Sequence, residues 1–292
     1  MPALHVIGCG RAGRAIARRL IATGRVRPGL VINRTLESAA DAVAFIGGGE
    51  PATASDERLA GGWLMLGLPD GVLASKIHSL SQRLPVRPAL AFHLSGALPA
   101  DVLSPLEVPV ASVHPVRAFA DPRFAVEHFE RTWCVAEGER EALDCLQPVF
   151  EAAGARWLSF ASTHKGAWHA ATVAASNFLV TTQALARELA VLAGLPEAQA
   201  AEVLSDLQQG TLESVRASDP VRALTGPIER SDFTACRRVV DALDRLPAQQ
   251  RQLFGALALA TLDLAVVKRG ARETDADLRK LLRDLAGRPT ND

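Results

Sequence analysis

A glycine-rich turn near the N-terminus constrains the fold more than any other feature of the sequence. The segment "LHVIGCGRAGRAIARRL" places Gly8, Gly10 and Gly13 in a G-x-G-x-x-G arrangement, after an apolar run typical of a buried strand and at the start of a helical pattern. Such glycines permit a tight turn, a close approach of backbone N–H groups to a pyrophosphate, and close packing of helix on strand. We therefore expect this turn, with Arg11 and Ala12, to bind a dinucleotide.

The chain up to about residue 160 alternates short apolar runs with helical patterns. This alternation favours a mostly parallel sheet with right-handed crossovers. Strands are expected at 4–8, 30–34, 63–69, 89–96, 108–115, 132–138 and 156–160. After Ser162 the strand signal vanishes, and helices are expected at about 163–193, 197–215, 232–246, 248–269 and 275–286, with a turn at "TGPIERSD". The sequence thus predicts an α/β chain: an N-terminal parallel-sheet domain, 1–161, and a C-terminal all-α domain, 162–292.

The end of the second predicted strand indicates which dinucleotide binds. An NAD-specific site usually places Asp or Glu there to hold the ribose hydroxyls, but this chain has Asn33, Arg34 and Thr35. A guanidinium and two neutral hydrogen-bonding groups would accept a 2′-phosphate, and Arg11 could add a second positive charge. NADP(H) is therefore favoured over NAD(H), although a solvated surface arginine is the simpler alternative for Arg34.

Polar groups also follow three later strands. Ligands of open α/β sheets lie beyond the carboxyl ends of the strands, and the residues at these ends are Leu68, Pro69 and Asp70, then His93, Ser95 and Gly96, then His114. The first group could lie along the nicotinamide ribose, and Ser95 and His114 could line the substrate side. Each also has an ordinary structural explanation as a satisfied histidine or a turn. A zinc site formed with His169 is disfavoured because no Cys or carboxylate accompanies the histidines, so we predict no metal.

The helix that begins near "THKGAWHAATVAASNF" carries polar groups among apolar ones. At 100° per residue, Lys165, His169 and Ser176 fall on one stripe, with Asn177 at its flank. Lys165 or His169 could donate a proton as hydride reaches a substrate, while Ser176 and Asn177 orient it. The alternative is that Lys165 and His169 only cap or bridge the seam between domains.

Composition limits the partners. The 32 basic and 32 acidic residues cancel, which removes the attraction that nucleic acid or an anionic membrane would exploit. No apolar run is long enough to span a membrane, and the four cysteines have no metal-ligand spacing. The absence of tyrosine excludes the Tyr proton donor of short-chain dehydrogenases. We expect a cytoplasmic protein with a small-molecule substrate.

Four segments carry a resemblance to a known family: "HLSGALPADVL", "SVHPVRAF", "KGAWHAATVAASNFLVT" and "ALTGPIERSD". They resemble motifs of bacterial proteins that join a Rossmann-like NADP-binding domain to a helical C-terminal domain of unassigned function. These proteins look like distant relatives of pyrroline-5-carboxylate reductase, prephenate dehydrogenase, the β-hydroxyacid dehydrogenases and ketopantoate reductase. The resemblance implies a homodimer formed through the helical domain and a catalytic role for Lys165.

The chain departs from the family pattern at two places. His169 stands where the β-hydroxyacid dehydrogenases and ketopantoate reductases often have Asn, so their mechanism does not transfer in detail. Ser231 stands where members often have Gly, which predicts the loss of a tighter turn, while Arg230 remains available for a substrate carboxylate.

Two functional hypotheses follow. The first is an NADP(H)-dependent oxidoreductase that reduces a small carbonyl or imino acid, with ketopantoate a candidate on resemblance alone. The second is a non-catalytic dinucleotide-binding sensor or scaffold. A sensor needs no proton donor, so its polar helical stripe would be apolar or occupied by internal salt bridges.

Overall fold

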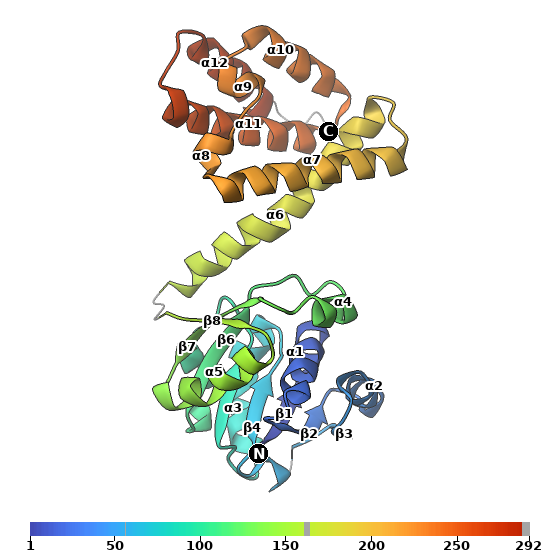
Figure 1. Ribbon diagram of the computed structural model, residues 1–292, viewed down its shortest axis with the longest axis vertical. Coiled ribbons are helices and arrows are strands. Elements are labelled where there is room, and N and C mark those ends of the chain that lie inside the picture. The colour runs from blue at the N-terminus through green and yellow to red at the C-terminus, as the bar shows by residue number, and fades with distance from the viewer. Residues whose placement is uncertain (56, 161–163, 288–292) are drawn as a thin grey trace. The chain divides into compact units, whose positions relative to one another are not determined.

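The computed structural model describes residues 1–55, 57–160 and 164–287, and it separates into two compact units (Figure 1). Unit 1 comprises residues 1–178 and unit 2 comprises residues 179–292. The division falls within the long helix α6 (Lys165–Leu192). The predicted start of this helix at Thr163 and the predicted domain boundary between residues 161 and 162 lie outside the described residues. Each unit is described separately below.

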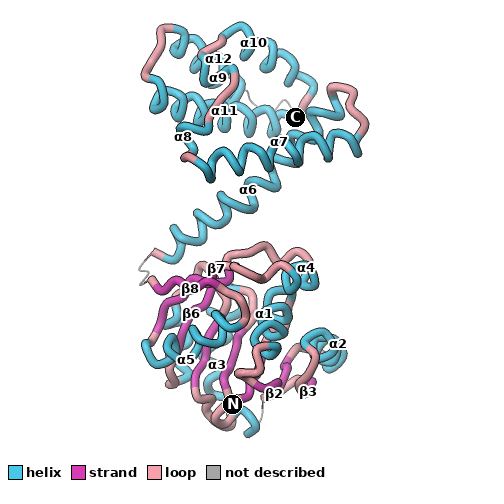
Figure 2. Tube along the Cα trace, in the orientation of Figure 1, coloured by secondary structure: helices cyan, strands magenta, loops and turns pink. Residues whose placement is uncertain are grey.

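Eight strands form one sheet in the described part of unit 1 (Figure 2). They are β1 (Ala3–Ile7), β2 (Arg27–Ile32), β3 (Glu50–Ala52), β4 (Trp63–Leu66), β5 (Leu90–His93), β6 (Val110–Pro115), β7 (Trp133–Gly138) and β8 (Arg156–Ser159). Their spatial order is β3-β2-β1-β4-β5-β6-β7-β8, and every neighbouring pair is parallel except β6 and β7. The predicted mostly parallel sheet is confirmed.

The strand order creates a crevice at the centre of the sheet. From β1 the chain builds outward through β2 and β3, then crosses back to place β4 on the other side of β1. Because this reversal separates the loops that follow β1 and β4, a ligand can enter between them at their carboxyl ends. The glycine-rich turn follows β1, and Gly67 follows β4, so the two loops border this crevice.

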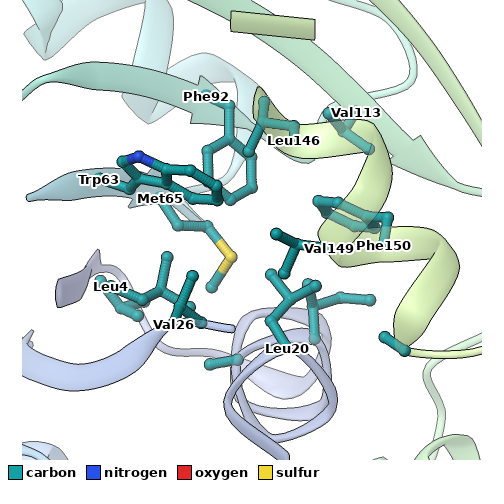
Figure 3. Packing of buried hydrophobic residues seen from close by; sticks show 14 of the residues in the cluster. Leu4, Leu20, Val26, Trp63, Met65, Phe92, Val113, Leu146, Val149 and Phe150 are labelled. Carbon is teal, nitrogen blue, oxygen red and sulfur yellow. The ribbon is translucent and has the colours of Figure 1, made fainter. Parts of the chain in front are cut away.

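Helices cover both faces of the sheet. One hydrophobic cluster joins the sheet to α1 (Arg11–Ala22), α2 (Leu36–Ile46) and α5 (Arg140–Ala152); the other joins it to α3 (Asp70–Arg83) and the 3-10 helix Ala100–Leu106. Figure 3 shows Leu20, Leu146 and Phe150 packed against Met65 and Phe92 in the first cluster. Two smaller elements, the 3-10 helix Glu57–Leu59 and α4 (Pro122–Glu127), complete the described part of this sheet domain.

Unit 2 is helical throughout its described part, which confirms the predicted all-α region. Beyond the end of α6 it contains α7 (Glu197–Ala217), α8 (Pro220–Ala223), α9 (Pro227–Arg230), α10 (Phe233–Ala242), the 3-10 helix Leu243–Arg245, α11 (Ala248–Arg269) and α12 (Thr274–Gly287). The prediction of a simple turn at "TGPIERSD" is wrong, because Pro227 begins the one-turn helix α9. Proline suits the first helical position, where its missing N–H is not needed.

The turn after α9 keeps the geometry that glycine would favour. Ser231 adopts a φ of 58°, in the left-handed region, so the predicted loss of a tighter turn is wrong. The buried Ser231 hydroxyl donates to Asp275 Oδ1 at 2.6 Å, which compensates for the backbone cost. Asp275 also forms a bidentate pair with Arg269, at 2.7 and 3.0 Å, and accepts the Arg272 N–H. These hydrogen bonds and the guanidinium hold the pKa of the Asp275 carboxyl well below its usual range.

We predict that Asp275→Ala destabilises the protein. The substitution leaves Arg269 buried without its partner, and losing one member of a buried pair costs about 3–5 kcal/mol. Urea denaturation measures the change. Asp277→Ala, at an exposed position in the first turn of the same helix, is the control and should cost less than about 1 kcal/mol. Equal losses of unfolding free energy in the two variants would contradict a stabilising role for the Arg269–Asp275 pair.

Candidate functional site

The glycine-rich turn is built from backbone atoms in close contact. Gly8 has a φ of 80°, and its N–H donates to the Ile32 carbonyl at 2.9 Å. A Cβ at Gly13 would lie 3.0 Å from the Gly8 carbonyl oxygen, and a Cβ at Gly67 would overlap with that same oxygen. The absence of side chains at Gly13 and Gly67 therefore lets α1 and the loop after β4 close around the turn.

The turn presents the N-terminus of α1 to the crevice. Gly10 is the N-cap residue and supplies no side-chain hydrogen bond, so the first N–H groups of α1 have no cap. The space beside Gly10 is open, since a Cβ added there would meet no atom within 4 Å. Uncapped N–H groups at the positive end of a helix dipole favour an anion such as a pyrophosphate.

The residues predicted to recognise the adenosine ribose have different tasks. Asn33 accepts the Cys9 N–H at 2.8 Å and donates to the Ser38 carbonyl at 2.9 Å, so it anchors the glycine-rich turn. Thr35 is the N-cap of α2. Arg34 is exposed and makes no hydrogen bond within the described residues. Of these three residues, only the arginine is uncommitted in the described part of the chain.

The loop after β4 forms the other border of the crevice. Leu68 packs against Gly8, Pro69 is the N-cap of α3, and Asp70 is the first residue of that helix. Opposite, the Arg11 side chain is exposed and makes a long 3.5 Å hydrogen bond to the Ala120 carbonyl. Four of the residues expected at the cofactor thus lie at the two loops that flank the crevice.

A row of polar residues crosses the sheet beside these loops. His93 on β5 pairs in register with Ser112 on β6, which pairs with Glu137 on β7. Lys165, in the first turn of α6, lies over this row and is only 4% exposed. Its ammonium group donates to Ser112 Oγ at 2.7 Å and lies 3.5 Å from Glu137 Oε1. Burial lowers the pKa of Lys165, and the attraction of Glu137 opposes that shift.

The two strand-end histidines differ in what they can do. His93 is fully buried; its Nδ1 accepts the Ser95 N–H, and its Nε2 lies 3.1 Å from the Pro99 carbonyl. His114 accepts the Trp168 indole N–H at Nδ1, which leaves its proton on Nε2. Burial, reinforced by the charge of Lys165, lowers the pKa of each imidazole to about 4. Both rings are therefore neutral at pH 7, and His114 keeps a donor N–H.

The turn that contains Ser95 packs beneath two imidazoles. Ser95 Oγ accepts the N–H groups of Ala97 and Leu98, so this hydroxyl shapes its own turn. A Cβ at Gly96 would lie 2.7 Å from His114 Cε1 and 2.8 Å from His169 Nδ1. The Nδ1 atom of His169 is buried and has no hydrogen-bond partner among the described residues.

A cleft of about 1020 Å³ within unit 1 has lining residues from both predicted sites, but the three glycines and residues 33–35 and 68–70 are not among them. Its lining residues include, from the two sites, Arg11, Ala12, His114, His169, Ser176 and Asn177. Lys165 and Ser95 are not among the lining residues. Lys165 is buried against Ser112 and Glu137, and the Ser95 side chain is committed to its turn.

Three further residues of this site were not singled out from the sequence: Ser112, Glu137 and Trp168. Ser112 precedes His114 by two positions on one strand, so alternation alone places both on the same face. Glu137 could not be found this way, because its pairing with Ser112 requires the antiparallel register of β6 and β7. Within the described residues, no group of three or more His, Cys, Asp or Glu side chains could hold a metal ion.

Comparisons with known proteins agree with this geometry at the level of the fold. A family model described as "Domain of unknown function (DUF2520)" matches residues 132–261. A Bacteroides fragilis protein assigned provisionally as an NADP oxidoreductase is 24% identical, with a TM-score of 0.72 over 90% of this chain and 98% of that one. The shared fold is Rossmann-type.

Two further solved structures extend the comparison. Plasmodium falciparum pyrroline carboxylate reductase with NADP bound is 13% identical, with a TM-score of 0.58 over 92% of this chain and 98% of that one. Aspergillus terreus reductive aminase, in complex with NADPH and ethyl-5-oxohexanoate, is 16% identical, with a TM-score of 0.58 over 100% of this chain and 96% of that one. A search of curated proteins gives no match. None of the described helices is both long and apolar enough to cross a membrane.

We predict that Gly67→Ala weakens NADPH binding by at least about tenfold, or 1.4 kcal/mol. The added Cβ overlaps with the Gly8 carbonyl oxygen and must displace the glycine-rich turn. Titration by NADPH fluorescence measures the effect. Gly71→Ala is the control, since a Cβ at Gly71 meets no atom within 4 Å. Unchanged binding in a folded Gly67→Ala protein would remove the turn from the cofactor site.

Proposed function

We propose that this chain is an NADP(H)-dependent oxidoreductase that reduces a small carbonyl or imino acid. One observation carries the proposal: a single cleft is lined both by Arg11 and Ala12 of the glycine-rich segment and by imidazole, hydroxyl and amide side chains of β6 and α6. A dinucleotide held at the turn would direct its nicotinamide toward the strand ends, where these groups lie. The NADP and NADPH complexes of two proteins with this fold are consistent with the proposal.

The cofactor preference rests on charge at the end of β2. A 2′-phosphate would meet the exposed Arg34 guanidinium, with Arg11 available from the turn, and no carboxylate among residues 33–35 opposes it. An NAD-specific site would normally use a carboxylate there to bind the ribose hydroxyls. NADP(H) is therefore the cofactor we propose, with NAD(H) less favoured.

The proposed chemistry assigns separate tasks to the two imidazoles that line the cleft. When bound, NADPH supplies a hydride to the substrate carbon. His114, neutral and protonated on Nε2, would donate a hydrogen bond to the carbonyl oxygen or imine nitrogen on which charge develops. His169 would supply the proton, since its ring borders the cleft. Ser176 and Asn177 would orient the substrate.

Lys165 receives an indirect task in this proposal. Its ammonium group is buried and engaged by Ser112 and Glu137, so direct proton donation to a substrate in the cleft would require it to leave both. The same ion pair favours the alternative function, a dinucleotide-binding sensor, because an internally paired lysine needs no catalytic purpose. His169 favours the enzyme, because it places an imidazole, the commonest general acid in enzymes, on the wall of the cleft.

We predict NADPH oxidation with at least one member of a panel of ketopantoate, other 2-keto acids and cyclic imines. His169→Gln should lower kcat by about 10²–10⁴-fold while NADPH still binds, because general acid catalysis contributes that much. His78→Gln, at an exposed position of α3, is the control and should leave kcat unchanged. Unchanged turnover in His169→Gln would refute the proton-donor role. NADPH binding without turnover of any substrate would favour the sensor.

We also propose that the chain forms a homodimer through its helical unit. Apolar side chains of unit 2 are unusually exposed, including Val180 on α6, Val203 and Leu207 on α7, and Val267 on α11. Val203 and Leu207 lie one turn apart on the same face of α7 and are 56% and 65% exposed. Large apolar side chains this exposed are typical of an interface, and a second copy is the partner that the family resemblance implies.

We predict that replacing Val203 and Leu207 together by Asp yields a monomer in sedimentation experiments, whereas the unaltered protein is a dimer. The two carboxylates would be desolvated in an apolar contact, which association cannot offset. Ala276→Asp, at an exposed position in the first turn of α12, adds charge outside this face and should leave the dimer intact. A monomeric unaltered protein would refute the proposal.

A further inference from the structure

The buried ammonium group of Lys165 depends on two partners, Ser112 and Glu137. Its side chain is 4% exposed, and an ammonium group removed from water is costly unless a counter-ion and hydrogen bonds replace the solvent. Ser112 Oγ provides a hydrogen-bond acceptor at 2.7 Å but no charge. The Glu137 carboxylate, 3.5 Å away and with its side chain 15% exposed, provides the neighbouring negative charge.

Several elements near Lys165 contribute titratable groups. Glu137 and Asp70 attract the ammonium charge, and burial together with that charge keeps two neighbouring imidazoles neutral. The titratable groups near Lys165 are Asp70 on α3, His93 on β5, His114 on β6, Glu137 on β7 and His169 one turn further along α6. Burial lowers the pKa of Lys165, and Glu137 is the largest of the influences that oppose this shift.

The lysine is also linked mechanically to the cleft. Ser112 Oγ, which accepts from Lys165, itself donates to the Ser95 carbonyl at 3.2 Å. The next residue is Gly96, whose Cα faces the rings of His114 and His169 so closely that no side chain fits. The chain of contacts therefore runs from Glu137 through Lys165 and Ser112 to the backbone beneath both imidazoles.

We propose that Glu137 is a positioning residue of this site. It supplies the counter-charge of Lys165, and the ammonium group, through Ser112, fixes the Ser95–Gly96 turn beneath His114 and His169. This inference rests on the proposed function, in which those two imidazoles polarise and protonate the substrate. Lys165 then acts through the turn and through its charge rather than by contact with substrate.

Glu137→Gln tests the charge without removing the hydrogen-bond acceptor. The Glu137 Oε1 atom accepts the Ala100 N–H at 2.8 Å, and a glutamine oxygen can still do so. The chain has only four lysines, so lysine Cε signals in ¹³C-labelled protein can be followed one by one through a pH titration. We expect the pKa of Lys165 to fall by about one unit or more in the variant, because its counter-charge is gone.

The control is Glu139→Gln, which removes an exposed carboxylate two positions away. It should leave the Lys165 titration unchanged. An unchanged titration in Glu137→Gln as well would overturn the inference. Glu137→Asp, which keeps the charge on a shorter side chain, should give an intermediate pKa, and it decides the question if Glu137→Gln fails to fold.

Kinetics separate positioning from simple structural support. Lys165 is protonated below its pKa, so activity that needs the ammonium is lost as pH rises through that value. Glu137→Gln should therefore move the basic limb of the kcat profile to lower pH together with the Lys165 titration, with KM nearly unchanged. A uniform loss of activity at every pH, with the limb in place, would indicate structural support only and contradict the inference.

The titration also separates this inference from the proposed function. If the unaltered protein binds NADPH but turns over no substrate, the proposed function fails, while the lysine signals still report whether Glu137 keeps Lys165 charged. If turnover is observed and the Lys165 titration is the same with and without the Glu137 carboxylate, the inference fails and the proposed function stands.

Discussion

The contact on which the site depends is a close approach of backbone atoms at the centre of the sheet. The Gly8 carbonyl oxygen is surrounded by Gly13 and Gly67, neither of which could carry a side chain without displacement. This contact joins the start of α1 to the loop after β4, and so it fixes the two borders of the crevice. Because α1 begins at this point, its uncapped N–H groups are held in a constant place relative to the strand ends.

A second constraint is the buried row of polar side chains on β5, β6 and β7. His93, Ser112 and Glu137 occupy adjacent positions on three strands, and the ammonium of Lys165 covers them. A buried row of this kind requires every member to be partnered, and the observed bonds meet most of that requirement. Burial and, secondarily, the charge of Lys165 lower the pKa of His114 to about 4, so this imidazole is neutral at physiological pH and can act as a hydrogen-bond donor rather than as an acid.

Much of the fold could be predicted from the sequence because the signals are local. The apolar runs, the glycine pattern and the long helical periods predicted seven of the strands and the all-α region. The strand β3 was missed, since three residues with a proline at the centre give no alternation to read. The antiparallel pairing of β7 was also beyond local pattern, because it depends on how the chain returns to the sheet edge.

The candidate site was predicted less completely, and the reason is that its chemistry depends on tertiary partners. The helical spacing of Lys165 and His169 is visible in the sequence, but the difference in their surroundings is not. Lys165 is enclosed by Ser112 and Glu137, whereas His169 borders the cleft. Only the register of β6 against β7 brings Glu137 beside the lysine, so the proton donor could not be chosen from spacing alone.

The central claim is that one cleft holds a nicotinamide dinucleotide beside the two imidazoles. A crystal structure of the protein grown with NADP⁺ tests it most directly. We expect the pyrophosphate on the N–H groups at the start of α1, the 2′-phosphate near Arg34, and the nicotinamide ring beside His114 and His169. A dinucleotide bound with its phosphates away from the Gly8–Gly13 turn, or with its nicotinamide directed away from these histidines, would contradict the account.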